Sequence, residues 1–419
     1  MDSLKIIGGR PLNGQIKISG AKNAALPLMA CGLLIDKGNL EIDSMPNLAD
    51  TKFMCILLES LGIKAKIINN IAYFSGDPSQ YVAKYDIVRK MRASILVLGP
   101  LLARVGIAKV SLPGGCSIGT RPVDLHIQAL ERMGATINLI NGYIEAKAPK
   151  NGLQGTEIKF PKISVGATEN IIMAASLANG RTKIFNAAKE PEIIDLANCL
   201  NSMGAKINGA GTSEIIIDGV GSLNGCKHTV IPDRIEAGSF AIAAAITGGE
   251  LELINCEPLH LLSLSEYLIK AGVNWKNTDK TITISSNGNL NPVSITTSEY
   301  PGFPTDLQAQ FMTLMSIANG NSKIVETIFE NRFMHVPELA RMGANINLDG
   351  RTANISGVQN LNGARLMATD LRASISLIIA ALRAKGESVI SRIYHLDRGY
   401  EKIEQKLINC GADIERIRE

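Results

Sequence analysis

The chain has 419 residues, of which 46% are hydrophobic and 20% charged, so it is long enough to bury two large cores. Its 43 basic and 39 acidic side chains leave a formal net charge of +4, and only 4% of its residues are aromatic. So weak a charge and so few rings do not suit a nucleic-acid-binding surface. We therefore expect a globular protein without a nucleic-acid partner.

The N-terminus and the cysteines predict a cytoplasmic protein. The segment MDSLKIIGGR has no basic stretch followed by an apolar one, and no apolar run reaches about 18 residues, the length of a membrane-spanning helix. The seven cysteines form no CxxC pair, and the five histidines show no HxxxH or HxH spacing, so we expect free thiols, no metal site and no membrane insertion. We find no GxxxxGK[ST] loop and no strand-linked GxGxxG, so no cofactor is predicted.

One pattern recurs six times along the chain: an apolar helical stretch ending near a glycine, then two short alternating strands. Examples are ERMGATINLINGYIEA and ARMGANINLDGRTANISG. A second marker runs in step, an alanine-rich apolar helix followed by a glycine and a β-branched strand, as in AASLANGRTKIFNAA. The marker glycines of the first pattern are Gly62, Gly134, Gly204, Gly272, Gly343 and Gly411, and those of the second are Gly38, Gly106, Gly180, Gly249, Gly320 and Gly386.

The period of about 70 residues exceeds that of common solenoids and favours six compact α/β units. The alanine-rich helices are apolar nearly all round, so we expect them to be buried, and we expect each second-marker glycine to end its helix with a positive φ. Six units divide into two domains of three, one spanning residues 22–229 and the other residues 1–21 plus 230–419. The N-terminal segment LKIIGGRPLNGQIKISG is expected to pair with the last repeat.

Charged residues at the starts of apolar helices are the first departures from the repeat. SGAKNAALPL places Lys22 and Asn23 where an amine and a helix N-terminus share an anion, although a lysine reaching into solvent explains the pattern equally well. VRKMRASIL and TDLRASISL place Arg92 and Arg372 at helix starts, which the helix dipole disfavours. We therefore expect an anion to compensate these arginines.

The turn SLPGGCSIGTRPVD differs most from its siblings. Its glycines Gly114, Gly115 and Gly119 let backbone amides approach a bound group closely, and Arg121 offers a planar pair of donors for phosphate or carboxylate. A free cysteine is more often an inert buried residue. The glycines and the guanidinium around Cys116 favour instead an anion-binding loop that carries a reactive thiol.

Three further segments of the C-terminal half carry charges in the same manner. FPTDLQAQF places Asp306 at a helix start, where a plain N-cap is an equal alternative. ENRFMHV and HLDRGYEKI add Arg332 and Arg398.

With these motifs the sequence resembles the UDP-N-acetylglucosamine 1-carboxyvinyltransferases, a family of enolpyruvyl transferases. The likeness covers essentially the whole chain, through segments such as SGAKNAALPL, LPGGCSIGTRPVDLH, ISVGATENI, PDRIEAG, FPTDLQAQF and YHLDRGYEKIEQKL. It implies two inside-out α/β barrel (prism) domains, each of three βαβαββ-type repeats, joined by a double crossover. The 22–229 domain would carry the cysteine loop and much of the UDP-sugar site.

The resemblance implies that the protein transfers enolpyruvyl from phosphoenolpyruvate to the 3-hydroxyl of UDP-N-acetylglucosamine and releases phosphate, the first committed step of peptidoglycan synthesis. In the family pattern Cys116 is the general acid, a covalent carrier of phosphoenolpyruvate, or both, and Asp306 handles the hydroxyl proton. The phosphoenolpyruvate positions fall on Lys22, Asn23, Arg121 and Arg398, of which Lys22 and Arg398 also count as catalytic.

The UDP-sugar positions of the family extend over both halves of the chain. They fall on Asn23, Arg92, Arg121, Pro122, Val123, Asp124, Leu125, Lys162, Ser164, Val165, Asp306 and Ile328, and supporting positions on Arg332, Asp370 and Arg372. Pro122 and Val123 also fit ordinary turn and core roles. Ala49 is a departure, because some relatives carry a lysine there.

Two other functions remain open from the sequence. Enolpyruvyl transfer to shikimate 3-phosphate shares the architecture, but its enzymes lack this cysteine loop. A six-repeat binding scaffold explains the periodicity but not the combination of Lys22, Cys116, Asp306 and Arg398.

The cysteine loop generates a test with fosfomycin, the epoxide that the resemblance implies alkylates Cys116. Cys116→Asp keeps a proton donor but removes the thiol, so we expect an active and fosfomycin-resistant enzyme in a phosphate-release assay. An active variant that remained sensitive would contradict this assignment.

Overall fold

The computed structural model describes residues 2–112 and 123–418. Contacts divide these residues into two compact units: a central unit of residues 20–112 and 123–231, and a terminal unit of residues 2–19 and 232–418. Within the described residues, the chain passes from one unit to the other between residues 19 and 20 and again between residues 231 and 232.

Each unit contains three four-stranded sheets among the described residues. In five of the six four-stranded sheets a short edge strand runs parallel to a central strand, which pairs antiparallel with a hairpin, as the predicted βαβαββ repeat requires. In the sixth, β1 and β26, from the two ends of the chain, take the place of the hairpin. The sheets of a unit are separate and form no closed barrel in the described chain. The sheet order is β16-β4-β6-β5, β7-β8-β10-β9 and β11-β12-β14-β13 in the central unit, and β2-β17-β19-β18, β20-β21-β23-β22 and β24-β25-β1-β26 in the terminal unit.

The strands are short, and many of them, such as β12 and β17, alternate buried with more exposed residues, as half-buried strands do. Those of the central unit are β3 (Ile35–Lys37), β4 (Leu40–Asp43), β5 (Lys64–Ile68), β6 (Ile71–Ser75), β7 (Val82–Ala83), β8 (Ile107–Ser111), β9 (Thr136–Ile140), β10 (Tyr143–Lys147), β11 (Glu157–Lys159), β12 (Arg181–Phe185), β13 (Lys206–Asn208), β14 (Glu214–Asp218), β15 (Leu223–Asn224) and β16 (Lys227–Thr229). Those of the terminal unit are β1 (Asp2–Ile7), β2 (Asn13–Lys17), β17 (Glu250–Ile254), β18 (Asn274–Asn277), β19 (Thr281–Ser285), β20 (Ile295–Thr296), β21 (Asn321–Val325), β22 (Asn345–Asp349), β23 (Thr352–Ser356), β24 (Arg365–Met367), β25 (Glu387–Ser391) and β26 (Asp413–Arg418).

The two ends of the chain complete sheets of the terminal unit. Strand β1 lies between β25 and β26, with Leu4 opposite Ile390 and Arg416, which confirms that the N-terminal segment pairs with the last repeat. The next strand, β2, instead supplies the parallel edge of the fourth repeat beside β17. The third repeat likewise supplies β16 as the edge of the first.

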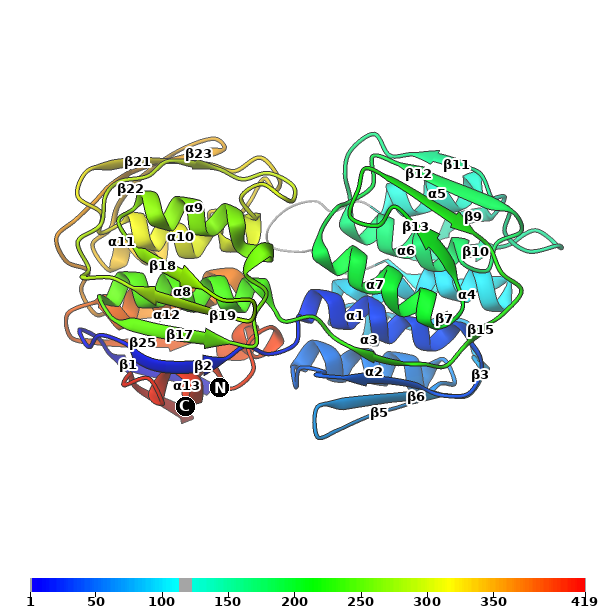
Figure 1. Ribbon diagram of the computed structural model, residues 1–419, viewed down its shortest axis with the longest axis horizontal. Helices are drawn as coiled ribbons and strands as arrows, with labels where there is room; N and C mark the ends of the chain where they lie inside the picture. The colour runs from blue at the N-terminus through cyan, green and yellow to red at the C-terminus, as the bar shows by residue number, and fades with distance from the viewer. Residues whose placement is uncertain (1, 113–122, 419) are drawn as a thin grey trace. The chain divides into compact units, whose positions relative to one another are not determined.

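In each unit the helices lie between the sheets (Figure 1). In the central unit they are α1 (Lys22–Ala30), η1 (Cys31–Leu34), α2 (Ala49–Ser60), α3 (Tyr85–Val88), η2 (Arg92–Val97), α4 (Leu98–Val105), α5 (Asp124–Arg132), α6 (Val165–Ala175) and α7 (Pro191–Ser202). In the terminal unit they are α8 (Arg234–Thr247), η3 (Pro258–Leu261), α9 (Leu262–Lys270), η4 (Thr305–Leu307), α10 (Gln308–Met315), α11 (Val336–Arg341), α12 (Leu371–Arg383), η5 (Ile393–Arg398) and α13 (Ile403–Ile408).

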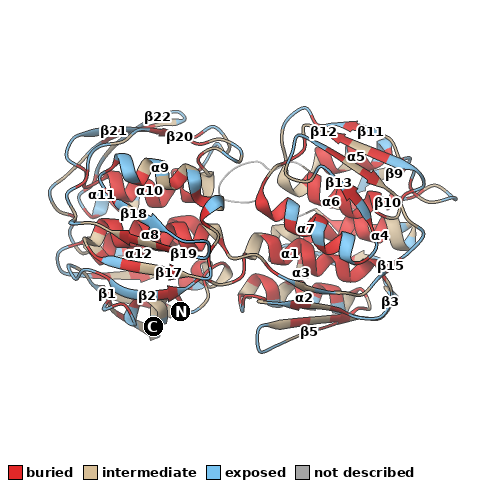
Figure 2. Cartoon of the chain, viewed as in Figure 1, coloured by how far each residue is buried: buried red, intermediate tan, exposed pale blue. Residues whose placement is uncertain are grey.

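The alanine-rich helices are buried, as their all-round apolar surfaces predict. Every residue of α8 from Ile235 to Ile246 is buried, and so is every residue of α12 from Arg372 to Leu382. Figure 2 shows the buried helices enclosed by strands with exposed outer residues in each unit. No helix of the described residues has the length and hydropathy needed to cross a membrane.

The glycine predictions hold for the positive φ of five of the six residues, but the predicted helix end holds directly only at Gly106. Gly38, Gly106, Gly180, Gly320 and Gly386 all have positive φ, but among these five only Gly106 directly ends an α-helix, whereas the others precede a strand. The prediction for Gly249 is wrong, because Gly248 ends α8 with φ 71°. Gly249 is needed for a different reason, since a Cβ there would overlap the carbonyl oxygen of Leu12.

Substitutions at two glycines of the terminal unit distinguish the need for a positive φ from the need for space beside the backbone. Gly386→Ala places its Cβ in open space at φ 88° and is expected to cost about 1 kcal/mol from backbone strain alone. Gly249→Ala must push β2 and β17 apart, so we expect a loss of about 3 kcal/mol. Urea unfolding of both variants measures the difference, and equal losses would contradict the packing role of Gly249.

Candidate functional site

Asp306 lies in η4, on a segment anchored by buried apolar side chains. Phe303 is 2% exposed and its ring packs edge-on against Phe311, with the ring centroids 5.2 Å apart, and Leu307 is fully buried. The Gln310 side-chain amide donates a 2.9 Å hydrogen bond to the Asp306 carbonyl oxygen. These contacts hold the backbone at Asp306 in place. The direction of its carboxylate then depends on the side chains that bind the carboxylate itself.

Two buried guanidinium groups clamp the Asp306 carboxylate. Arg332 Nη2 donates to Oδ1 and Arg372 Nη2 donates to Oδ2, both at 2.7 Å. The arginine side chains are only 3% and 6% exposed, whereas that of Asp306 is 25% exposed. The alternative that Asp306 is a plain N-cap is therefore wrong, and the anion expected beside Arg372 is this carboxylate.

The pKa of Asp306 lies well below its usual range. Burial alone would raise it, but the charges of Arg372 and Arg332 and their hydrogen bonds outweigh that effect. The carboxylate is therefore ionised throughout the physiological pH range.

A chain of buried polar groups supports the clamp from behind. Arg372 Nη1 donates to the Tyr400 hydroxyl at 3.2 Å, and that hydroxyl lies 2.8 Å from Ser239 Oγ. Gln310 Nε2 donates to the same Ser239 oxygen at 3.2 Å, which links the chain back to the helix beside Asp306. Burial raises the pKa of Tyr400, so its hydroxyl keeps its proton and can serve as donor to Ser239 while accepting from Arg372.

The remaining predicted residues of the terminal unit lie on neighbouring segments. Asp370 is the N-cap of α12, where its Oδ1 accepts hydrogen bonds from the backbone of Arg372 at 2.8 Å and of Ala373 at 3.0 Å. Arg398 is the last residue of η5 and Ile328 follows β21; both are half-buried.

Lys22 opens α1 in the central unit. Its Nζ lies 3.2 Å from Oδ2 of Asp50, whose side chain is 1% exposed, and the lysine side chain is 13% exposed. The alternative of a lysine reaching freely into solvent is therefore wrong. Asn23 follows in the first turn of the same helix and is half-buried.

Arg92 opens η2, a 3-10 helix, rather than the α-helix expected at that position. Burial, and then the charge of Arg92, lowers the pKa of His126 to about 4, so this imidazole is neutral. The Asn170 side-chain amide lies 2.9 Å from His126 Nδ1 and donates to it, because its Oδ1 accepts from Gly99 N at 2.7 Å. The imidazole proton therefore resides on Nε2.

The other predicted UDP-sugar residues lie near two helix starts. Asp124 and Leu125 begin α5 just after Val123, and Asp124 Oδ1 is buried and accepts no hydrogen bond from any described residue. Ser164 is the N-cap of α6, Val165 begins that helix, and the side chain of Lys162 is exposed. The predictions for Cys116, Arg121 and Pro122, and for the loop glycines around them, lie outside the described residues.

Three contributors were not anticipated from the sequence. Asp50 belongs to an amphipathic helix in which an acidic residue at the first turn looks ordinary. Tyr400 lies within the quoted segment HLDRGYEKI but has no role there in the sequence analysis, and Ser239 follows PDRIEAG directly. His126 is one of the five histidines whose spacing predicts no metal site. No cluster of metal-binding side chains occurs among the described residues.

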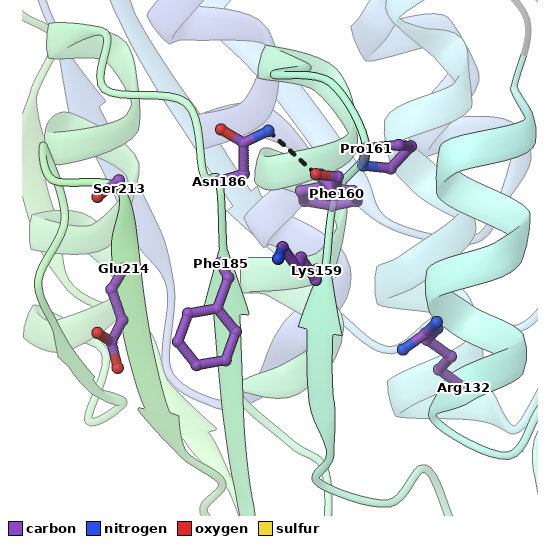
Figure 3. Close-up of a pocket in the computed structure, with 8 residues that line it drawn as sticks. All are labelled: Arg132, Lys159, Phe160, Pro161, Phe185, Asn186, Ser213 and Glu214. Carbon is purple, nitrogen blue, oxygen red and sulfur yellow. Dashed lines mark hydrogen bonds between the residues drawn. The ribbon is translucent and has the colours of Figure 1, made fainter.

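A cavity of about 590 Å³ opens on the central unit beside the outer face of the β11–β12–β14 sheet (Figure 3). No predicted site residue lines it, although Pro161 directly precedes Lys162. Its lining residues are Arg132, Lys159, Phe160, Pro161, Phe185, Asn186, Ser213 and Glu214.

Comparison with known proteins places the chain among carboxyvinyltransferases. The family model of EPSP synthase (3-phosphoshikimate 1-carboxyvinyltransferase) matches residues 6–407. Proteins named UDP-N-acetylglucosamine 1-carboxyvinyltransferase from Rhodospirillum centenum and Granulibacter bethesdensis are each 57% identical, with all of both chains covered.

Solved structures support the same fold. The enolpyruvyl transferase NikO from Streptomyces tendae matches with a TM-score of 0.88 and 24% identity over 99% of this chain and 98% of its own. EPSP synthase from Acinetobacter baumannii matches with a TM-score of 0.76 and 18% identity over the full length of both chains.

The clamp predicts how stability depends on pH. Asp306→Asn is expected to lower the free energy of unfolding by about 2 kcal/mol at pH 7, because it leaves two buried guanidinium groups without their anion. Since the folded-state pKa is depressed, this contribution is constant above about pH 4 and is lost as the pH falls through the folded-state pKa. The difference from wild type should therefore narrow below pH 4 in urea titrations.

Asp413→Asn is the matched control. Asp413 pairs with Arg10 at 2.8 Å, but the two side chains are 38% and 60% exposed, so we expect a change of about 0.5 kcal/mol or less. A difference for Asp306→Asn that is the same at pH 7 and pH 3 would contradict the low pKa.

Proposed function

We propose that this chain, which belongs to the EPSP synthase family, transfers enolpyruvyl from phosphoenolpyruvate to the 3-hydroxyl of UDP-N-acetylglucosamine with release of phosphate. The observation that carries the proposal is 57% identity over the full length to enzymes named for this reaction. The product feeds peptidoglycan synthesis, and the free-thiol cysteine pattern favours the cytoplasm.

The reaction requires two proton transfers that balance each other. The sugar oxygen bonds to C2 of phosphoenolpyruvate as its proton leaves, and C3 gains a proton, which gives a tetrahedral intermediate. Elimination then removes a proton from C3 and breaks the bond from C2 to the phosphate oxygen. We assign the hydroxyl proton to Asp306 and the C3 proton to Cys116.

The two guanidinium groups allow Asp306 to stay ionised, and so to act as a base, beside the multiply charged phosphoenolpyruvate. An approaching phosphate and carboxylate would raise the pKa of a lone carboxyl group and protonate it. Arg332 and Arg372, each 2.7 Å from the carboxylate, oppose that effect and keep an oxygen able to accept the proton. A carboxylate with so low a pKa is a weak base. It therefore accepts the hydroxyl proton only as the new C–O bond forms and makes that proton more acidic.

Lys22, Asn23, Arg121 and Arg398 are assigned to phosphoenolpyruvate. The contact with Asp50 at 3.2 Å directs the Lys22 ammonium, whose positive charge suits the phosphate and carboxylate of the substrate. Fixed cations of this kind stabilise the charge that develops in the transition state.

The UDP-sugar is assigned to the helix starts of the central unit, at Arg92 and residues 121–125, 162, 164 and 165, with Ile328 near the sugar. Support comes from the buried Asp124 Oδ1, which accepts no hydrogen bond from a described residue and so suits an N–H donor of the ligand. The charge of Arg92 reaches the neutral His126, whose Nε2 lies beside Gly166, the residue after Val165.

Transfer to shikimate 3-phosphate is the second candidate, because the matching family model carries that description. The solved EPSP synthase is only 18% identical, which speaks for the shared fold alone. We therefore rank this activity behind transfer to the UDP-sugar.

Phosphate release from phosphoenolpyruvate tests the proposal. Purified protein is incubated with UDP-N-acetylglucosamine, with shikimate 3-phosphate, or with no acceptor. We expect release only with the UDP-sugar, and Asp306→Asn should reduce it by about a hundredfold or more. Release with shikimate 3-phosphate would move the activity to the second candidate, and release with neither acceptor would contradict enolpyruvyl transfer.

A further inference from the structure

Glu326 is a fully buried carboxylate that the assigned chemistry does not use. It directly follows β21 in the terminal unit, and its side chain is 0% exposed. No ion pair to it occurs within the described residues, so hydrogen bonds alone offset the cost of burying its charge.

Four donors converge on this carboxylate. Oε1 accepts from the Thr297 hydroxyl at 3.0 Å, from Ile328 N at 2.8 Å and from Phe329 N at 3.1 Å. Oε2 accepts from the Thr305 hydroxyl at 2.9 Å. A carboxylate offers about two acceptor sites on each oxygen, so Oε1, with three donors, is fully used, whereas Oε2 receives one described donor.

The sibling repeats show which of these contacts the fold itself requires. The residue after the central strand has positive φ in four described repeats, at Ser44, Asn186, Asn255 and Arg392, and Glu326 departs from this pattern. The side chains of Asn186 and Asn255 each donate to the residue that follows the edge strand, at 3.0 Å.

The contact between Glu326 and Thr297 is the counterpart of those sibling bonds, because Thr297 follows the edge strand β20. The longer side chain also reaches Thr305 and the backbone of Ile328 and Phe329, for which the described siblings show no equivalent. The fold therefore accounts for one of the four bonds and leaves three to another role.

Those three bonds join the segment of Asp306 to the segment of Arg332, one of its two guanidinium partners. Thr305 directly precedes Asp306 in η4. The Phe329 ring lies under the Arg332 guanidinium, with 5.4 Å between the Arg332 Cζ atom and the ring centroid, and Arg332 donates to Asp306 at 2.7 Å. Ile328 is itself assigned to the sugar.

We infer that Glu326 is a positioning residue: it fixes Asp306 through Thr305, and Arg332 and Ile328 through the backbone of residues 328 and 329. The inference rests on the proposed function, because it assigns Glu326 the task of holding the hydroxyl-proton acceptor in register with the sugar. A displacement of about 1 Å at a reacting group lowers turnover by about a hundredfold.

Three variants distinguish positioning from a general stabilising role. Glu326→Leu removes all four bonds and should lower kcat by about a hundredfold. Thr305→Val removes only the bond beside Asp306 and should lower kcat by about tenfold, while the melting temperature and the KM for phosphoenolpyruvate stay near wild type. Glu326→Gln should keep kcat within about threefold, because its Oε1 accepts from the three donors and its amide donates to a reversed Thr305 hydroxyl.

Glu330→Gln is the matched control, since Glu330 lies on the same segment but is half exposed and pairs with Arg351 at 3.4 Å. Hydrogen–deuterium exchange supplies a readout that needs no activity. In Glu326→Leu the amides of residues 305–307 and 328–332 should exchange faster than in wild type. In Thr305→Val only those of residues 305–307 should do so, and in Glu330→Gln neither range should change.

The outcomes separate the two claims. If the wild-type protein releases no phosphate with UDP-N-acetylglucosamine, the proposed function fails, and exchange still decides whether Glu326 holds these segments. If the wild-type protein is active and Thr305→Val keeps both its kcat and its exchange rates, the inference is overturned. A Glu326→Gln enzyme as impaired as Glu326→Leu would overturn it as well.

Discussion

The contact of the Asp306 carboxylate with the guanidinium groups of Arg332 and Arg372 is the interaction on which the terminal unit depends. Two arginines that are 3% and 6% exposed require an anion, and Asp306 is the described acidic side chain that meets both. Behind the clamp, Tyr400, Ser239 and Gln310 form a hydrogen-bonded chain that starts at Arg372. The same charges that make the burial possible keep the carboxylate ionised, as the proton transfer proposed for it requires.

The repeat explains how such a site arises without disturbing the fold. Each unit uses the same buried helix, central strand, outer helix and hairpin, so the core is secured by residues that recur. The proposed functional residues lie where a copy differs from its siblings: at Arg372 in the first turn of α12, at the lysine that opens α1, and at Glu326, where four other repeats turn with positive φ. These positions lie at helix starts and strand ends, which tolerate substitution better than the packed helix interiors do.

Most of the fold could be predicted from the repeat period of the sequence. The repeat, the buried helices and the pairing of the N-terminal strand follow from glycine spacing and apolar patterning, because those features record local backbone needs and burial. The contacts between the residues of the candidate site could not be predicted from the sequence. Asp50 and Lys22 are 28 positions apart, and Thr305 and Glu326 are 21 apart, so only the tertiary fold brings them together. The Gly249 error is of the same kind, since its constraint comes from Leu12, far away in sequence.

The central claim is that Asp306 remains an ionised carboxylate held by two guanidinium groups. Carbon-13 NMR of protein labelled at the aspartate side-chain carboxyl carbon tests it most directly, with the Asp306 signal assigned by its loss in Asp306→Asn. The account predicts a signal at the ionised position that does not titrate between pH 8 and pH 4.5. A titration with its midpoint inside that range would contradict it.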